Sequence, residues 1–470
     1  MVFDFTDTIA APATIPGTGA ITIIRVSGSR SLEICDKVIS LSNGSLSEAA
    51  GYSVHYGTAH YPDGKMLDQV LVTVFRNPHS YTGEDSVEIS CHASKFVAEE
   101  LLVLLSNEGA RSALPGEFTR RSFVNGKMDL AQAEAVADVI SSESSASLEV
   151  ALNQLKGGFS SELKDLRSKL VEITSLLELE LDFSEEDVQF VDRCKLISMI
   201  DTVSSHVDSL AVSFRYGNAL KNGIPVVIVG PANSGKSTLL NSLLGDQRAI
   251  VSDIPGTTRD TIEETITIDS IKYRLIDTAG LRNTADQIEK IGIQRSYDNL
   301  SKASIVLLIL DYSLPLEDLQ SSISDITSRI DFENQELIIL LNKSDIWASN
   351  KNVSQFNNFV SSIVPDAVVL PVSAKTDSKL TDLKNHLSKS QKAKYSNSGT
   401  SIVTNIRHLQ ALQDTSSALQ SAKQAILSDL TPDLIAEDLH NALHHLGSIT
   451  GETAPDEILG LIFSRFCIGK

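Results

Sequence analysis

The stretch "GPANSGKSTLLN", Gly230 to Asn241, decides the fold of the middle of the chain. Gly230, Gly235, Lys236 and Ser237 match the pattern G-x-x-x-x-G-K-[ST], and they stand between an apolar run, "PVVIV", and the helical "STLLNSLLG". In this pattern the glycines let backbone N–H groups surround phosphates, the lysine reaches the outer phosphates, and the serine binds Mg²⁺. The stretch therefore predicts a P-loop nucleotide-binding domain.

Three more segments predict which nucleotide binds. "DTAG" (Asp277–Gly280), "NKSD" (Asn342–Asp345) and "SAK" (Ser373–Lys375) each follow an apolar run typical of a strand. Asp277 is placed for the magnesium shell and Gly280 for the terminal phosphate. The last carboxylate of "NKSD" accepts two N–H bonds from guanine, a donor pair that adenine lacks. We therefore predict a GTP-binding domain.

A switch loop and an unusual catalytic arrangement are also expected. "GTTRD" (Gly256–Asp260) is placed so that Thr258 completes the magnesium shell when GTP is bound, and such loops relax on hydrolysis. Ras-like proteins orient the attacking water with a glutamine at the position of Leu281, so another group must supply that function here. Asn233 offers a carbonyl oxygen beside the phosphates, where we expect it to hold a monovalent cation.

Length and composition set the broad class. With 470 residues, 42% hydrophobic and 21% charged, the chain suits a globular protein of three domains. Its four cysteines form no C-x-x-C pair, which favours neither a zinc site nor a disulfide framework and fits a reducing cytosol. No apolar run reaches the length of a membrane span. The net charge of −20 means that any contact with RNA must be local. For the basic run that begins at Lys379, a solvated helix face is the favoured interpretation.

The residue composition and the spacing of apolar residues change along the chain, and these changes predict its domain organisation. Short β-rich runs mark a mixed α/β unit at the N-terminus, a proline-free helical stretch lies between Pro115 and Pro225, and buried strands then alternate with helices. Helical periodicity returns after about residue 390. We predict an α/β domain over 1–120, a discontinuous helical domain over 121–218 and 389–470, and an inserted Ras-like P-loop domain over 219–388.

Several segments together carry a family resemblance. "GAITIIRVSG", "SYTGEDSVEI", "PGEFTRRSFVNGKMDLAQAEAVADVI", "DIPGTTRD", "DTAGLR" and the terminal "FCIGK" span essentially the whole chain. On these segments the sequence resembles the bacterial MnmE (TrmE) family of tRNA modification GTPases. The general GTPase motifs alone would fit ribosome-assembly GTPases equally well.

The resemblance implies a function and partners. It implies a cytoplasmic homodimer that hydrolyses GTP and forms a heterotetramer with the flavoprotein MnmG (GidA), which carries FAD. Together they would add a carboxymethylaminomethyl or aminomethyl group at C5 of the wobble uridine of certain tRNAs. Potassium would drive dimerisation of the GTPase domains.

The resemblance also implies roles for individual residues. Magnesium would be held by Ser237 and Thr258, and Glu289 would orient the attacking water, although a plain solvated helical glutamate is the alternative for Glu289. The implied potassium ligands are Asn233, Ser252, Ile254 and Thr257. The implied GTP contacts are Asn233, Ser234, Gly235, Lys236, Ser237, Thr238, Ser252, Asp253, Ile254, Pro255, Gly256, Thr257, Thr258, Asp277, Thr278, Ala279, Gly280, Asn342, Lys343, Asp345, Ser373, Ala374 and Lys375.

For the N-terminal domain the resemblance implies a folate-binding fold that forms the constitutive dimer. It would bind 5-formyltetrahydrofolate as one-carbon donor through Arg25, Glu88, Lys127 and Lys470. Without the resemblance each of these would be taken for a surface charge. Cys467, near the end of the chain, is either a group that takes part in the modification chemistry or a packed small hydrophobe.

A second function remains open from the sequence. A GTPase switch that docks on RNA, without one-carbon chemistry, would carry the same nucleotide motifs. It would have no affinity for folate. Against it, the sequence after the GTPase motifs contains no recognisable RNA-binding element such as a KH "GXXG" loop.

Overall fold

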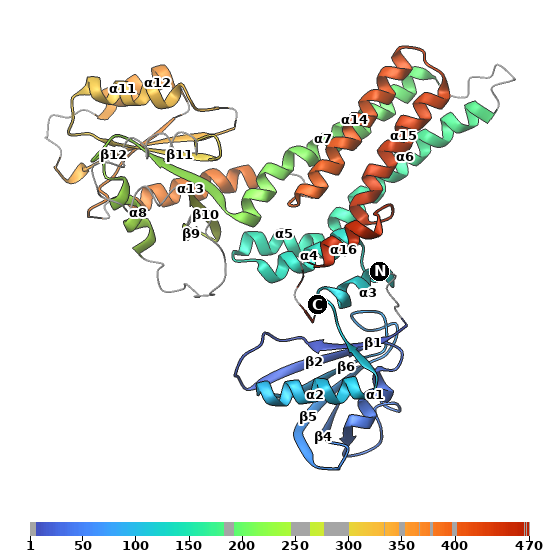
Figure 1. Cartoon of the computed structure of the whole chain (residues 1–470). Helices are drawn as coiled ribbons and strands as arrows, with labels where there is room; N and C mark the ends of the chain where they lie inside the picture. The colour runs from blue at the N-terminus through green and yellow to red at the C-terminus, as the bar shows by residue number, and fades with distance from the viewer. Residues whose placement is uncertain are drawn as a thin grey trace. The chain divides into compact units, whose positions relative to one another are not determined.

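The structure is a computed structural model (Figure 1), and it describes residues 6–182, 192–245, 264–276, 300–332, 334–346, 353–365, 367–376, 379–396, 402–464, 466 and 468–469. The chain divides into two compact units. Unit 1 comprises Met1–Ile140, Leu152–Asp208 and Gln410–Lys470, and unit 2 comprises Ser141–Ala151 and Ser209–Leu409. The helices α7 (Arg193–Asn222) and α13 (Leu380–Ser396) run without interruption across positions 218 and 388. The domain boundaries expected from the sequence stay predictions.

Unit 1 contains a seven-stranded sheet in the order β3-β4-β5-β6-β2-β1-β7. Its strands are β1 (Thr8–Pro12), β2 (Ile21–Ser27), β3 (Ile39–Leu41), β4 (Ser53–His60), β5 (Met66–Phe75), β6 (Ser86–His92) and β7 (Ala110–Ser112). Two helices, α1 (Ser31–Val38) and α2 (Lys95–Asn107), supply buried side chains to the core on one face of this sheet. Alternate residues of the central strands, such as Val70, Val72 and Val74, are buried against them, because strand side chains point to opposite faces in turn.

The other face of this sheet is covered only in part. Phe118 of helix α3 (Glu117–Val124) and Tyr81 pack with buried residues of β1 at one end of the face. Farther along, side chains on β4 and β5 stay largely exposed: Val54 at 62%, Tyr56 at 50% and Leu71 at 48%. The strand register places Tyr56 opposite Leu71. The open part of this face therefore carries exposed apolar and aromatic side chains beside polar ones such as Gln69.

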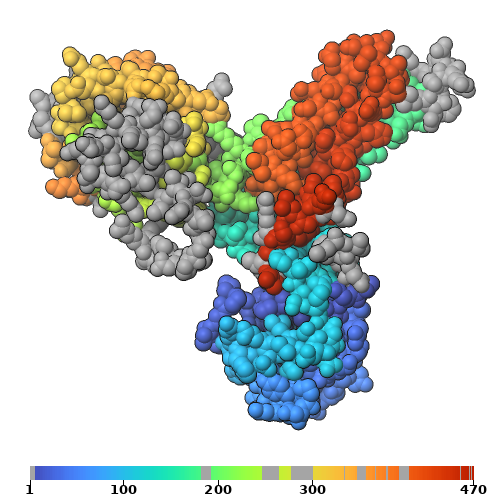
Figure 2. Space-filling model, viewed as in Figure 1, coloured from blue at the N-terminus to red at the C-terminus, as the bar shows by residue number. Residues whose placement is uncertain are grey.

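The helical part of unit 1 is built around a long antiparallel contact. Helices α6 (Gly158–Asp182) and α15 (Pro432–Thr450) lie side by side although they are far apart in the sequence (Figure 1). Helix α16 (Asp456–Ser464) packs on α3, where Phe463 contacts Phe123, and Figure 2 shows this C-terminal segment in red against α3 in cyan. Helices α4 (Leu130–Ser141) and α14 (Ile406–Leu427) belong mostly to unit 1, whereas α5 (Ser145–Leu155) and α7 are divided between the two units.

Unit 2 holds a six-stranded sheet in the order β13-β12-β11-β8-β10-β9. Its strands are β8 (Ile224–Val229), β9 (Glu264–Ile268), β10 (Ile271–Ile276), β11 (Ile305–Asp311), β12 (Glu336–Asn342) and β13 (Val368–Pro371). All neighbouring pairs are parallel except the hairpin of β9 and β10. The run "IVLLILD" of β11 is buried at every position, as expected for a parallel strand covered on both faces.

Two apolar clusters cover the two faces of the unit 2 sheet. One includes side chains of α8 (Lys236–Gly245) and α13, and the other includes side chains of α11 (Leu316–Thr327) and α12 (Val353–Ile363). Successive residues of β8, such as Val226 and Val227, enter opposite clusters. The predicted fold class, an α/β domain inserted into a helical domain behind an N-terminal α/β domain, is confirmed. Within the part of the chain that the structure describes, no helix combines the length and apolar character needed to cross a membrane.

Candidate functional site

The P-loop lies at the carboxyl end of β8, and its glycines are required by close backbone approaches. A Cβ on Gly230 would lie 2.2 Å from the carbonyl oxygen of Ile309, and one on Gly235 would lie 2.1 Å from Nδ2 of Asn342. Any side chain at either position would displace the loop. Helix α8 begins directly afterwards at Lys236, so the free N–H groups of its first turn face the loop. The loop therefore has the shape that a phosphate group needs.

Asn342 joins the P-loop to the "SAK" segment. Its side-chain Nδ2 donates to the carbonyl oxygen of Ser234 at 2.8 Å, and its Oδ1 accepts from the backbone N–H of Ala374 at 3.0 Å. A third hydrogen bond joins α8 to the "SAK" segment: the Ser242 hydroxyl donates to the carbonyl oxygen of Ala374 at 2.7 Å. Two loops that are distant in sequence are thereby held in one fixed geometry.

Asp345 presents a carboxylate at the end of this assembly. The Ser373 hydroxyl donates to its Oδ1 at 2.7 Å, while the residue itself is exposed. That hydrogen bond, its own backbone N–H, and the nearby Lys375 and Lys343 hold the pKa of Asp345 below its usual value. The carboxylate is therefore ionised at neutral pH and able to accept hydrogen bonds.

Except for the buried Ser234, the predicted GTP contacts that the structure describes line one pocket of about 440 Å³. Asn233, Lys236 and Ser237 lie on one side, and Lys343, Asp345 and Lys375 also line it. The Lys236 ammonium donates to the carbonyl oxygens of Gly230 and Pro231, at 2.9 and 2.7 Å, and so stays inside the loop. The volume suits a small-molecule ligand of nucleotide size.

Other predicted residues lie outside the described residues. These are the switch segment with its cation ligands, the "DTAG" segment, the catalytic glutamate, and two residues of the chain's last five: Ser252, Asp253, Ile254, Pro255, Gly256, Thr257, Thr258, Asp277, Thr278, Ala279, Gly280, Glu289, Cys467 and Lys470. The roles expected for them stay predictions.

In unit 1 the structure brings Arg25 and Glu88 together. They face each other across β2 and β6, and the Arg25 guanidinium forms an ion pair with the Glu88 carboxylate at 2.8 Å. The guanidinium carbon lies 5.1 Å from the centre of the Tyr81 ring and 5.6 Å from that of Phe118. These cation–π contacts hold Arg25 at the border of the open sheet face.

Lys127 is placed differently. Its ammonium donates to the carbonyl oxygen of Pro78 at 3.0 Å, and its side chain packs over Gly83. The loop that contains Tyr81 is therefore contacted by both Lys127 and Arg25. Sequence reasoning missed Tyr81 and Phe118, although "SYTGED" and "PGEFT" contain them, because nothing local shows that their rings meet an arginine.

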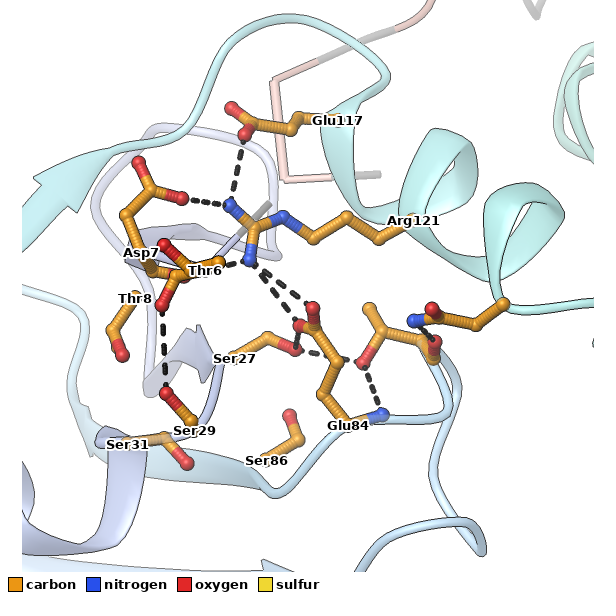
Figure 3. A network of polar contacts seen from close by, with 12 residues as sticks. Thr6, Asp7, Thr8, Ser27, Ser29, Ser31, Glu84, Ser86, Glu117 and Arg121 are labelled. Carbon is orange, nitrogen blue, oxygen red and sulfur yellow. Dashed lines mark hydrogen bonds and ion pairs between the residues drawn. The ribbon is translucent and has the colours of Figure 1, made fainter. Parts of the chain in front are cut away.

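A network of ion pairs around a buried arginine supports the same region (Figure 3). Arg121 of α3 has a fully buried side chain and contacts the carboxylates of Asp7, Glu84 and Glu117. Glu117 also pairs with Arg111 at 2.6 Å. Burial alone would raise the pKa of Glu117, but the hydrogen bonds from Arg111, Leu114 N–H and Arg121 outweigh it, and the pKa lies below its usual value. The network joins α3 to the sheet.

Two protein-family models match consecutive parts of the chain. The family model of the MnmE helical domain matches residues 130–467, and that of the N-terminus of the GTP-binding protein TrmE matches residues 8–127. A protein of Parabacteroides distasonis named tRNA modification GTPase MnmE is 44% identical over 466 residues, covering 98% of this chain and 100% of that one. Proteins of the same name from Flavobacterium johnsoniae and Cytophaga hutchinsonii are also 44% identical, over 99% and 100% of this chain and 99% of each of those.

Two solved structures that the chain resembles each match part of it. The G domain of the T. maritima FeoB iron transporter is 24% identical with a TM-score of 0.25, over 35% of this chain and 97% of that one. A GTP-binding protein from Sulfolobus solfataricus in complex with GDP is 20% identical with a TM-score of 0.27, over 48% of this chain and 67% of that one. The fold of unit 2 is established by its own strand order and P-loop.

Proposed function

Because this chain belongs to the MnmE family of tRNA modification GTPases, we propose that it adds a carboxymethylaminomethyl or aminomethyl group at C5 of the wobble uridine of certain tRNAs. It would do so in the cytoplasm, with the FAD-carrying flavoprotein MnmG as partner in a heterotetramer. The chain itself is a GTPase. The observation that carries the proposal is the 44% identity over essentially the full length of the relatives, N-terminal domain included.

The test is mass spectrometry of tRNA nucleosides from cells with and without the gene. We expect the aminomethyl-type wobble uridines to disappear on deletion and to return with the wild-type gene. An unchanged nucleoside profile would favour the alternative, a GTPase that docks on RNA without one-carbon chemistry. Calorimetry with 5-formyltetrahydrofolate on the wild type and Arg25→Ala separates the same two functions, since the alternative has no folate affinity.

The one-carbon donor is assigned to the Arg25 region. Arg25 would pair with a carboxylate of the folate, Glu88 would accept N–H bonds from the pterin, and Lys127 and Lys470 would add positive charge. The exposed fractions of the Arg25 and Glu88 side chains, 19% and 25%, support this, because both stay accessible while they hold each other in place. Cys467 is the candidate for chemistry on the transferred group.

Hydrolysis is assigned to the pocket of unit 2. Ser237 and Thr258 would hold magnesium, and Asn233, Ser252, Ile254 and Thr257 would hold potassium, which would neutralise charge on the phosphates. Glu289 would orient water. The described members support this, since Asn233 and Ser237 both line the pocket and Asn233 adopts the left-handed conformation, with φ of 59°. A non-glycine residue in that conformation is held there by its surroundings.

Asn233→Ala tests the potassium site. We expect the variant to lose potassium-stimulated hydrolysis by about a hundredfold while it still binds GTP, because the lost oxygen acts on transition-state charge. Rates in KCl and NaCl, together with nucleotide affinity, measure this. Asn241→Ala is the matched control, since Asn241 is exposed on α8 and does not line the pocket. Continued stimulation of Asn233→Ala would place the cation elsewhere.

The homodimer is assigned to the open face of the N-terminal sheet, covered by a second copy of the chain. Val54, Tyr56 and Leu71 are apolar or aromatic and about half exposed or more, which is unusual for neighbouring residues of one sheet face. The face continues to Arg25 and Glu88 through the paired strands β5, β6 and β2. A partner copy on this face would therefore also shelter the folate site.

Leu71→Arg tests this surface. We expect the dimer to weaken by about 2–4 kcal/mol, because an arginine would be buried unpaired at the centre of the contact. Light scattering or sedimentation over a concentration series gives the mass. Val103→Arg is the control, because Val103 is 52% exposed on α2, which covers the opposite face of the sheet. A Leu71→Arg protein that stays dimeric at low concentration would rule this face out.

A further inference from the structure

Asp311 and Lys343 lie together at the carboxyl edge of the unit 2 sheet. Strands β11 and β12 are parallel, and their register places Asp311 opposite Asn342, the last residue of β12. Lys343 follows at once and adopts the left-handed conformation, with φ of 62°. This turn directs the lysine back across the strand ends toward Asp311.

The two side chains form a well-defined ion pair. The Lys343 ammonium lies 2.6 Å from Oδ2 of Asp311, and the other oxygen, Oδ1, accepts from the backbone N–H and the hydroxyl of Ser313, at 3.0 and 2.6 Å. The Asp311 side chain is only 11% exposed. Each carboxylate oxygen thus has its own partners, which fixes the carboxylate plane and with it the ammonium.

The position of this ammonium matters because Lys343 lines the nucleotide pocket with Asp345. A lysine side chain has several freely rotating bonds, and an unrestrained ammonium two residues from a carboxylate would pair with it. Lys343 and Lys375 are both close enough to act electrostatically on Asp345. A pairing with Lys343 would occupy the oxygens that the guanine base needs.

We propose that Asp311 is a positioning residue for guanine recognition, which acts by holding the Lys343 ammonium away from Asp345. With Lys343 tied to Asp311, the Asp345 carboxylate keeps one oxygen on Ser373 and presents its remaining acceptor positions to the two N–H groups of the base. The inference rests on the proposed base-binding role of Asp345.

Asp311→Asn is the variant that tests it, in the full chain. The amide can keep the Ser313 contacts through its oxygen but turns an N–H₂ group toward the ammonium, which is released. We expect the Kd for GDP to rise about tenfold. The Kd for IDP should rise less, because hypoxanthine lacks the 2-amino group and uses the carboxylate less fully. The preference for GDP over IDP, measured as the ratio of the two Kd values, should therefore decrease.

Three further variants serve as controls for this result. Asp325→Asn removes an exposed ion pair between Asp325 of α11 and Arg329, just beyond the end of that helix, and should leave both affinities unchanged. In a Lys343→Met background, Asp311→Asn should add little, because no ammonium is left to release. Ser313→Ala removes the hydroxyl donor to Oδ1 and leaves only the backbone N–H to orient the carboxylate, so it should give the same change at smaller size, and it serves if Asp311→Asn does not fold.

Two results would overturn the inference: unchanged GDP affinity in Asp311→Asn, or a loss in which GDP and IDP weaken equally, as expected from a general loss of fold. Thermal unfolding of the nucleotide-free protein identifies the second case. Failure of the proposed base pocket itself would show separately, as an Asp345→Asn variant that does not change its base preference.

Discussion

Asp345→Asn is expected to change the preferred nucleotide from GTP to XTP. The carboxylate accepts from the two N–H groups of guanine, whereas an amide in its place offers one acceptor and one donor. Xanthine presents the complementary pair, an N–H and a carbonyl oxygen in place of the amino group. In Asp345→Asn, bound guanine would cover the amide and leave one of its own N–H groups without an acceptor, so GTP affinity should fall by about 10²- to 10⁴-fold.

The geometry around Asp345 makes the result specific. Because Ser373 donates to Oδ1 at 2.7 Å, the asparagine oxygen will take that position and the amide nitrogen will face the base. Ser373→Ala is the matched control: it removes the orienting hydrogen bond, should weaken GTP about tenfold, and should gain nothing for XTP. Competition titrations with both nucleotides measure all three proteins. GTP affinity that stays unchanged in Asp345→Asn would contradict the assignment of this pocket.

The nucleotide site could be predicted from the sequence because each of its parts is a short local pattern. The apolar runs before Gly230, Asn342 and Ser373 identify buried parallel strands, and parallel strands end at one edge of their sheet. The order of these patterns was therefore enough to bring them together. No pattern of this kind identifies Asp311, which is one of 60 acidic residues and acquires its role only from the register between β11 and β12.

The N-terminal site shows more clearly what cannot be predicted from the sequence alone. Arg25, Glu88 and Lys127 were identified only through the family resemblance, since charged residues on strands are ordinarily solvated. The contacts that orient Arg25 come from Tyr81 and Phe118, which are remote from it in sequence. Such contacts depend on how the sheet and α3 pack, and no periodicity in the sequence encodes that.

The buried network around Arg121 leads to the second large effect. Arg121→Ala is expected to destabilise the N-terminal α/β part of unit 1 by about 3–5 kcal/mol, because the buried Glu117 loses one of its two arginine partners and Glu84 loses its ion pair with Arg121. Arg121 has a fully buried side chain and Glu117 is only 3% exposed, so solvent cannot replace the lost guanidinium (Figure 3). Arg121→Lys keeps the charge without the planar fork and should lose less.

The measurement has to be local, because a chain of several units does not unfold in one step. Hydrogen exchange of peptides from β1, β6 and α3 reports the stability of this region within the full-length protein. Arg30→Ala is the control, since it breaks an exposed pair with Glu33 in the same unit and should leave the protection nearly unchanged. Protection that survives Arg121→Ala would mean that apolar packing alone holds α3 on the sheet.

The network also gives this region a pH dependence of known sign. Burial would raise the pKa of Asp7, but the hydrogen bonds from Arg111 and Arg121 and their charges outweigh it and lower that pKa, as they do for Glu117. A carboxyl whose pKa is lower in the folded state adds stability above its unfolded pKa and loses it as the pH falls through the folded pKa. Wild-type protection in β1 and α3 should therefore decrease in acid. In Arg121→Ala the decrease should begin at higher pH, because Asp7 and Glu117 lose one of the two arginines that lower their pKa and keep only Arg111.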